Sequence, residues 1–213
     1  MLKGDKTEEK ILNSAREVFV EKGFDGARMQ EIANRAGVNK ALLNYYFRSK
    51  EKMFTTVFEL IFRPAMKNIV EIFDQDGDIY SIIEDFIRRH QRFVRQHPEV
   101  PKMIATELGS PKTKLFGSMY NILFSNIKRM DVPGKFISKL ETAVAEGIIR
   151  PISPIHLIVN IPSMNIMYIV TQPLMEQLFS EYIHSWENFA QEREEEVVSF
   201  VLHSLRPDNT ASK

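Results

Sequence analysis

Basic side chains gather in one short stretch of a chain that is neutral as a whole. The 213 residues contain 28 Lys and Arg against 28 Asp and Glu. Residues 27 to 52 nevertheless hold six basic residues against two acids, Glu31 and Glu51. The six are Arg28, Arg35, Lys40, Arg48, Lys50 and Lys52. A local excess of positive charge suits the phosphates of a nucleic acid, although a basic face by itself is often merely solvated.

The same stretch holds side chains that can contact the bases or the backbone of a DNA duplex. We expect Asn39, Lys40, Ala41 and Asn44 to face the floor of a groove. There Lys40 could reach guanine acceptors, Ala41 a thymine methyl group and Asn44 an adenine edge. A second set would contact the DNA backbone, which sets the register without reading sequence. That set is Arg28, Gln30, Tyr45 and Lys50.

Two short helices must position these residues, one over residues 28 to 36 and one over residues 39 to 47. Ala33 is small enough for the helices to approach closely, and Gly37 suits a turn that needs a left-handed backbone. The inward positions are Ile32, Ala36, Val38, Leu43 and Tyr46. This is the pattern of a helix-turn-helix, whose second helix enters the major groove. A plain corner between two helices has the same pattern, and the local charge favours DNA binding over it. Tyr46 and Phe47 are expected in the core.

Helical spacing of apolar residues continues along the rest of the chain, with no convincing pair of strands. Ser49 is expected to cap a long helix over residues 50 to 73, which Pro64 should kink. The further helices are expected at residues 79–96, 101–108, 112–130, 133–146, 155–171 and 185–205. The predicted class is all-α. A helix-turn-helix domain at residues 1–50 would be followed by a helical domain at 51–205 and a disordered tail at 206–213.

Two runs carry a more specific resemblance: Ile32-Ala33-Asn34-Arg35-Ala36-Gly37-Val38 and Tyr45-Tyr46-Phe47-Arg48-Ser49-Lys50-Glu51. With the preceding helix, residues 11 to 19, and Lys22-Gly23-Phe24, they resemble the signature of the tetracycline-repressor-like (TetR) family. The resemblance implies three DNA-binding helices, followed by helices that form a ligand pocket and a dimer interface. Ala27-Arg28 stands where the family usually has Thr-Ser, Asn39 where it has Ser, and Asn44 where it has Tyr. Asn39 caps comparably well, and Arg28 is expected to contact phosphate.

The family resemblance also implies an effector site in the C-terminal half. Residues 56 to 205 hold eleven of the fifteen phenylalanines and seven of the ten methionines. Each of these residues could equally belong to an ordinary core, but together they could line a cavity for an apolar or aromatic small molecule. The pocket candidates are Phe93, Met103, Phe116, Tyr120, Phe124, Met164, Met167 and Tyr168, with His90 and Glu107 to orient the ligand. Bound ligand would move the helix at residues 50 to 73 and release the repressor from its operator.

A homodimer is expected, because two recognition helices must lie about 34 Å apart to enter successive major grooves of a palindromic operator. The helix at residues 155 to 171 is apolar on most sides. The last helix places Trp186, Phe189, Val197, Val201 and Leu205 at helical spacing. Two such helices from each subunit would form a four-helix bundle. A monomer could instead use the same residues for its own core.

Other classes of protein fit the sequence poorly. The chain has no cysteine, its five histidines are scattered, and no His-Glu-x-x-His motif or phosphate-binding glycine loop occurs. We therefore expect no enzyme, no cofactor and no metal site. No apolar run reaches the roughly 20 residues that a membrane span needs, so a cytoplasmic protein without a membrane partner is expected. The alternative function is a DNA-binding activator or architectural protein without an effector.

Overall fold

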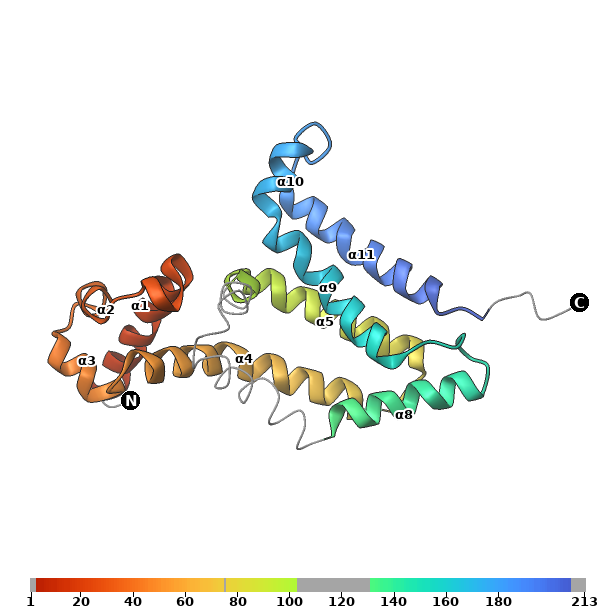
Figure 1. Ribbon diagram of the computed structural model, residues 1–213, viewed down its shortest axis with the longest axis horizontal. Coiled ribbons are helices and arrows are strands. Elements are labelled where there is room, and N and C mark those ends of the chain that lie inside the picture. Colours follow the sequence, from red (N-terminus) through yellow and green to blue (C-terminus); the bar gives the residue numbers. More distant parts are fainter. Residues whose placement is uncertain (1–2, 75, 103–130, 208–213) are drawn as a thin grey trace, which may run out of the picture. The chain divides into compact units, whose positions relative to one another are not determined.

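The computed structural model of this chain describes residues 3–74, 76–102 and 131–207, and every regular element within these ranges is a helix (Figure 1). The all-α prediction is therefore confirmed. The expected helix at residues 112–130, and most of that at 101–108, lie outside the described residues. No single helix within these ranges has the length and apolarity to cross a membrane. Two consecutive helices, Pro154–Val170 and Gln172–Leu178, meet those criteria only when joined across a 66° bend.

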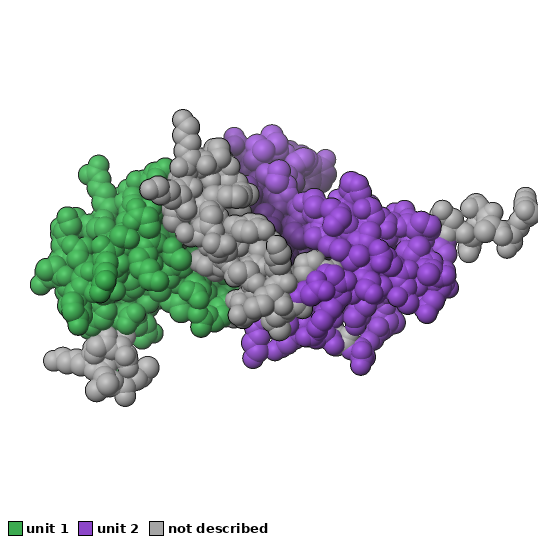
Figure 2. Space-filling model, turned by 60° about the horizontal axis from the view of Figure 1, so that its bottom comes forward, with its two compact units in different colours: residues 1–64, 99–126 green, residues 65–98, 127–213 purple. Residues whose placement is uncertain are grey.

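The chain forms two compact units (Figure 2), one of residues 1–64 with 99–126 and the other of residues 65–98 with 127–213. The first unit contains α1 (Lys3–Gly26), α2 (Met29–Ala36), α3 (Lys40–Phe47) and the first part of α4 (Lys50–Asp74). Compactness thus places the start of α4 with the N-terminal helices. The expected domain boundary, between residues 50 and 51, follows the first residue of that helix.

Local signals in the sequence set the ends of these helices. Gly23 interrupts α1 with a φ of 65°, and Gly37 ends α2 in a left-handed conformation with a φ of 63°. In the loop after α2, the Val38 N–H donates to the Ala33 carbonyl over 3.0 Å. The Ser49 hydroxyl accepts a 3.1 Å hydrogen bond from the Lys52 N–H, which caps α4 as expected. The two short helices and their turn therefore follow the predicted pattern.

An aromatic cluster holds α1 to the first turns of α4. The Phe54 ring lies edge-on to Phe19 and Phe24, with ring centroids 5.0 and 5.4 Å away. Further along α4, the ring centroids of Phe58 and Phe62 lie 4.3 Å apart. All five rings are buried. Because such rings supply much of the apolar area of a small core, the N-terminal unit depends on α4 for its stability.

The second unit is built around α5 (Ile79–Gln96). It also contains the last part of α4 and the helices α8 (Val132–Ala145), α9 (Pro154–Val170), α10 (Gln172–Leu178) and α11 (Trp186–Ser204). Helices α5, α9 and α11 pack on one another (Figure 1). The buried side of α5 meets Leu140 of α8, Leu157 of α9 and Val197 of α11 in one apolar core. Helix α10 lies between the helices expected at residues 155–171 and 185–205, where no helix was expected, and Pro173 stands in its first turn. Proline is tolerated in the first helical turn, where its missing N–H has no partner to lose.

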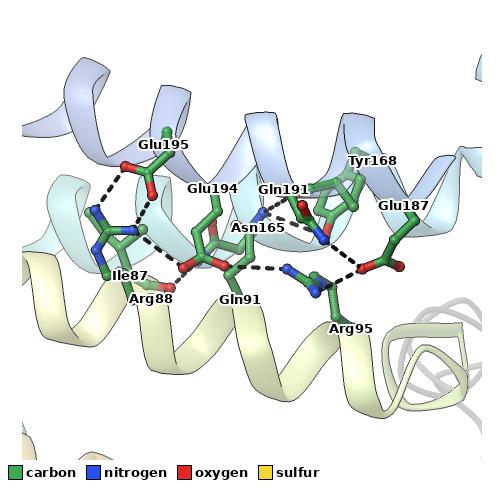
Figure 3. A network of polar contacts seen from close by, with 11 residues as sticks. Ile87, Arg88, Gln91, Arg95, Asn165, Tyr168, Glu187, Gln191, Glu194 and Glu195 are labelled. Carbon is green, nitrogen blue, oxygen red and sulfur yellow. Dashed lines mark hydrogen bonds and ion pairs between the residues drawn. The ribbon is translucent and has the colours of Figure 1, made fainter. Parts of the chain in front are cut away.

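Ion pairs join α5 to α11 outside this core (Figure 3). The Arg88 guanidinium donates to both carboxylate oxygens of Glu195, over 2.6 and 2.9 Å, and Arg95 donates to Glu187 over 3.0 Å. The bond from Arg88 holds the pKa of the Glu195 carboxyl below its usual range. Exposed pairs of this kind add little stability, about 0 to 1 kcal/mol each. The two-pronged geometry of the Arg88–Glu195 pair instead helps fix how α5 and α11 align.

Candidate nucleic-acid interface

Buried side chains of α2 and α3 hold the turn between these two helices. Ile32, Ala33 and Ala36 of α2 and Leu43 of α3 are 0% exposed, and Phe47 is 3% exposed. Phe47 is therefore a core residue, as expected. Tyr46 is half-buried, with its ring 6.2 Å from that of Phe47. These contacts fix the angle between the two helices, which a helix-turn-helix requires.

The opposite face of α3 is open to solvent. Asn39, Lys40, Ala41, Asn44 and Tyr45 are all exposed, and the Tyr45 side chain reaches 79%. The Asn39 side chain also caps the helix, since its Oδ1 accepts from the Leu42 N–H over 2.7 Å. The structure thus brings the expected base-reading residues together on one exposed face, at the start and middle of the helix.

Three further residues were expected to contact the DNA backbone. Arg28 and Gln30 are exposed at the start of α2, and the Gln30 amide donates to Asn34 over 2.9 Å. Lys50 differs from them. It is half-buried, and its ammonium donates to the carbonyls of Phe24, over 2.8 Å, and Ala27, over 3.1 Å.

Arg35, counted in the basic stretch, is also engaged within the protein. Its guanidinium donates to both carboxylate oxygens of Glu21, over 2.6 and 2.9 Å, and lies 3.5 Å from Glu17. These bonds hold the pKa of the Glu21 carboxyl below its usual range. Arg35 therefore joins α2 to α1. The count of charges along the sequence missed this, because Glu17 and Glu21 lie on another helix.

Arg48 was counted as a charge in the sequence but not named as a contact. It follows α3 directly, is exposed, and has a positive φ of 57°. A non-glycine residue with this backbone is uncommon and strained. Its position at the end of the recognition helix makes its guanidinium a further candidate for a phosphate contact. The positive φ could not be read from the residue type.

The expected effector residues fall into separate places. Met103, Glu107, Phe116, Tyr120 and Phe124 lie outside the described residues. Met164, Met167 and Tyr168 line a groove of about 600 Å³, which also contacts α10 through Met175 and α11 through Phe189. His90 and Phe93, on α5, are not among the residues that line it.

His90 belongs to a buried polar cluster between α5 and α9. Burial lowers the pKa of this histidine to about 4, so its ring is neutral at pH 7. Its Nδ1 lies 3.2 Å from the Asn165 amide nitrogen, which also donates to the Ile87 carbonyl over 3.2 Å. Asn165 Oδ1 and Gln91 Oε1 are buried without a hydrogen-bond partner in the described structure. Gln91 was not singled out from the sequence, since a lone glutamine on a helix gives no such signal.

Comparison with protein families gives two matches along the chain. Residues 11–57 match the family model of bacterial regulatory proteins of the tetR family. Residues 61–208 match the model of the C-terminal region of YcdC-like proteins. Together the matches cover both compact units. In the described segments, no three His, Asp or Glu side chains are grouped as metal ligands.

Individual relatives are transcriptional regulators of the HTH type. The chain is 27% identical over 197 residues to the HTH-type transcriptional regulator RutR of Escherichia coli O157:H7, covering 92% of this chain and 89% of RutR. It is 31% identical over 103 residues to the HTH-type transcriptional repressor NicS of Pseudomonas putida, about half of each chain (48% and 49%). Among solved structures, FadR of Bacillus subtilis in complex with stearoyl-CoA superimposes with a TM-score of 0.66 and 14% identity, covering 93% of this chain and 99% of FadR. At 14% identity, the similarity to FadR shows a shared fold and no more.

Proposed function

The chain belongs to the TetR family of bacterial transcriptional regulators, and on this premise we propose that it is a repressor that a small molecule releases from DNA. The exposed face of α3 is the observation that supports this proposal most directly. It presents Lys40, Ala41 and Asn44 on a helix of the right size for the major groove, and its first turn is capped. The match to the repressor NicS over about half of the chain supports repression.

We assign the reading of bases to Asn39, Lys40, Ala41 and Asn44. Arg28, Gln30 and Tyr45 would contact the backbone, together with Arg48 at the end of α3. Base contacts determine which sequence is bound, whereas phosphate contacts strengthen binding to any duplex. Loss of a residue in the first group should therefore change the sequence preference, and loss of one in the second group should lower the affinity for every duplex.

A homodimer would present two such helices to the two halves of an operator. An exposed stripe with a four-residue spacing runs along α9 and comprises Ile155, Val159, Ser163 and Met167, with Phe200 exposed on α11. The three apolar members of this stripe are 56 to 60% exposed, and Phe200 is 67% exposed. Residues at this spacing lie on one helical face, so a second copy could cover them in a four-helix bundle. Trp186, Phe189, Val197 and Val201 instead pack into the core of their own unit.

The effector would bind within the second unit. Met167 belongs to the stripe just described. The other described candidates for ligand contact are His90, Phe93, Met164 and Tyr168. An apolar or aromatic molecule remains the proposed class, and an acyl-CoA is a reasonable member of a test panel because FadR, a structural neighbour, is complexed with stearoyl-CoA. The ligand can shift the equilibrium between the DNA-binding and the released conformation only to the extent that it binds one of them more tightly. Movement of α4 would then change the separation of the two recognition helices.

Binding of purified protein to duplex DNA tests the proposal. Fluorescence anisotropy would compare the region upstream of its own gene with a random duplex of equal length and base content, at low and at physiological salt. We expect tighter binding to the upstream region, and a fall in affinity with one compound of a panel that also stabilises the protein in a thermal-shift assay. Failure to bind either duplex at low salt would overturn the DNA-binding role. Specific binding that no compound weakens would favour the regulator without an effector.

A further inference from the structure

The end of α1 exposes backbone carbonyls that the side chain of Lys50 engages. The last carbonyls of a helix have no partner within the helix and need another donor. The Lys50 ammonium lies 2.8 Å from the carbonyl oxygen of Phe24, 3.4 Å from that of Asp25 and 3.1 Å from that of Ala27. An ammonium group has three donors, so these carbonyls use its full capacity.

The position of the ammonium is also favourable electrostatically. The Phe24 ring lies 4.4 Å from Lys50 Nζ, within the range of a cation–π contact. The C-terminal end of a helix carries a partial negative charge that favours a cation. To reach a DNA phosphate, Lys50 would have to give up three hydrogen bonds and this ring.

We propose that Lys50 is a positioning residue, which ties the first turn of α4 to the connection between α1 and α2. The inference rests on the proposed DNA-binding role of α3, but it replaces the expected phosphate contact of Lys50. On the far side of the motif, α3 passes into α4 through only Arg48 and Ser49. The α2–α3 pair is thus anchored to α4 at both ends, by the peptide chain after α3 and by Lys50 before α2.

This double attachment determines how the motif responds when α4 moves. The rings of Phe19 and Phe24 already hold α1 on Phe54 of α4. Lys50 adds polar contacts to the connection that leads from α1 into α2, so this connection moves with the first turn of α4. Lys50 therefore tightens the dependence of the recognition helix on the position of α4, which is the helix expected to respond to an effector.

The salt dependence of DNA binding separates a positioning residue from a phosphate contact. Each phosphate that a protein neutralises contributes about 0.9 to the slope of log affinity against log salt. Lys50→Met keeps a chain of similar length and removes the charge. We expect a roughly tenfold loss of affinity, in line with the loss of hydrogen bonds to a charged group, with an unchanged slope. Lys52→Met is the matched control, because Lys52 is exposed in the same helical turn and its ammonium makes none of these three contacts.

A second variant and a second measurement keep the test independent of folding. Lys50→Arg keeps the charge but cannot place one nitrogen against three convergent carbonyls, so it should also weaken binding. Affinities are measured well below each variant's melting temperature, where a general loss of stability leaves Kd unchanged. In both variants, hydrogen exchange should speed up at residues 24 to 31 and remain unchanged in α5 and α11.

Two results would overturn the inference: a slope for Lys50→Met lower by about 0.9, or wild-type affinity for Lys50→Arg with unchanged exchange at residues 24 to 31. Failure of the wild-type protein to bind DNA would instead refute the proposed function. The exchange measurement would still show in that case whether Lys50 holds the connection between α1 and α2.

Discussion

The Oδ1 atom of Asn39 accepts a 2.7 Å hydrogen bond from the backbone N–H of Leu42, at the start of the helix that faces solvent. An unpartnered N–H in this turn weakens a helix by about 1 kcal/mol. We therefore expect Asn39→Ala to speed up hydrogen exchange at Leu43 roughly fivefold, because exchange reports the local free energy of opening. Asn39→Ser should keep slow exchange, since serine also caps. If both variants exchange alike, the cap does not stabilise α3.

Lys40 is expected to read sequence rather than to add general affinity. Lys40→Ala should change the base preferred at one position of each half-site, because a good contact to a base edge contributes about 1 to 3 kcal/mol of discrimination. Selection from a pool of randomised duplexes measures this preference. Lys67→Ala is the control, since Lys67 is an exposed lysine in the second unit. An unchanged preference in Lys40→Ala would remove Lys40 from the base-reading set.

Gly37 requires its left-handed backbone. A Cβ added here would meet only the flexible end of Lys10, 3.2 Å away, so the conformation rather than crowding sets the penalty. We expect Gly37→Ala to destabilise the first unit by about 1 to 2 kcal/mol, measured as loss of protection at Ile32 and Leu43. Gly77→Ala should have little effect, because Gly77 has no positive φ and the nearest atom is 3.9 Å from the added carbon. Equal effects from both variants would refute this explanation.

Burial of His90 predicts a dependence of stability on pH. The pKa in the folded protein is about 4, below the value of 6.5 for a free histidine. The unfolded chain therefore binds the proton first, and stability falls as the pH decreases from about 6.5 to 4. The loss attributable to this residue is roughly 3 kcal/mol.

Urea unfolding at pH 7 and pH 4.5, followed by fluorescence of the single tryptophan, Trp186, reports on the unit that contains His90. His90→Gln should lose stability less steeply than the wild type as the pH falls. His156→Gln alters an exposed histidine and should follow the wild type. If the profile of His90→Gln also parallels the wild type, His90 does not contribute to the pH dependence.

The exposed stripe on α9 and the exposed ring on α11 predict that charge at these positions separates the subunits. Val159→Glu combined with Phe200→Glu should convert a dimer into a monomer in sedimentation velocity, because burying a charge without a partner is costly. Leu60→Glu places the same charge on an exposed apolar residue outside the stripe, on α4, and should leave the mass unchanged. A wild-type protein that sediments as a monomer would contradict the proposed dimer.

Features set by neighbouring residues were predictable from the sequence. The left-handed Gly37, the Ser49 cap and the two short helices all depend on residues within one or two turns. Features set by distant residues were not. The place of Lys50 depends on where α1 ends, and Glu195, the partner of Arg88 on α11, lies about a hundred positions further along the chain. The apolar pattern of α11 could serve a partner or its own core, and only packing shows that Val197 and Val201 serve the core.

The packing of Phe54 on Phe19 and Phe24 of α1, with Phe58 and Phe62 packed behind it on α4, has a consequence for how such regulators can be recombined. A chimaera joined at residue 50 would combine helices α1 to α3 of one protein with α4 of another, and the aromatic rings of the two parts would no longer fit. A junction after Phe62 would transfer those rings together with α1 to α3. Exchange of DNA specificity between homologues, in evolution or in the laboratory, should therefore succeed more often when the first three turns of α4 are exchanged together with α1 to α3.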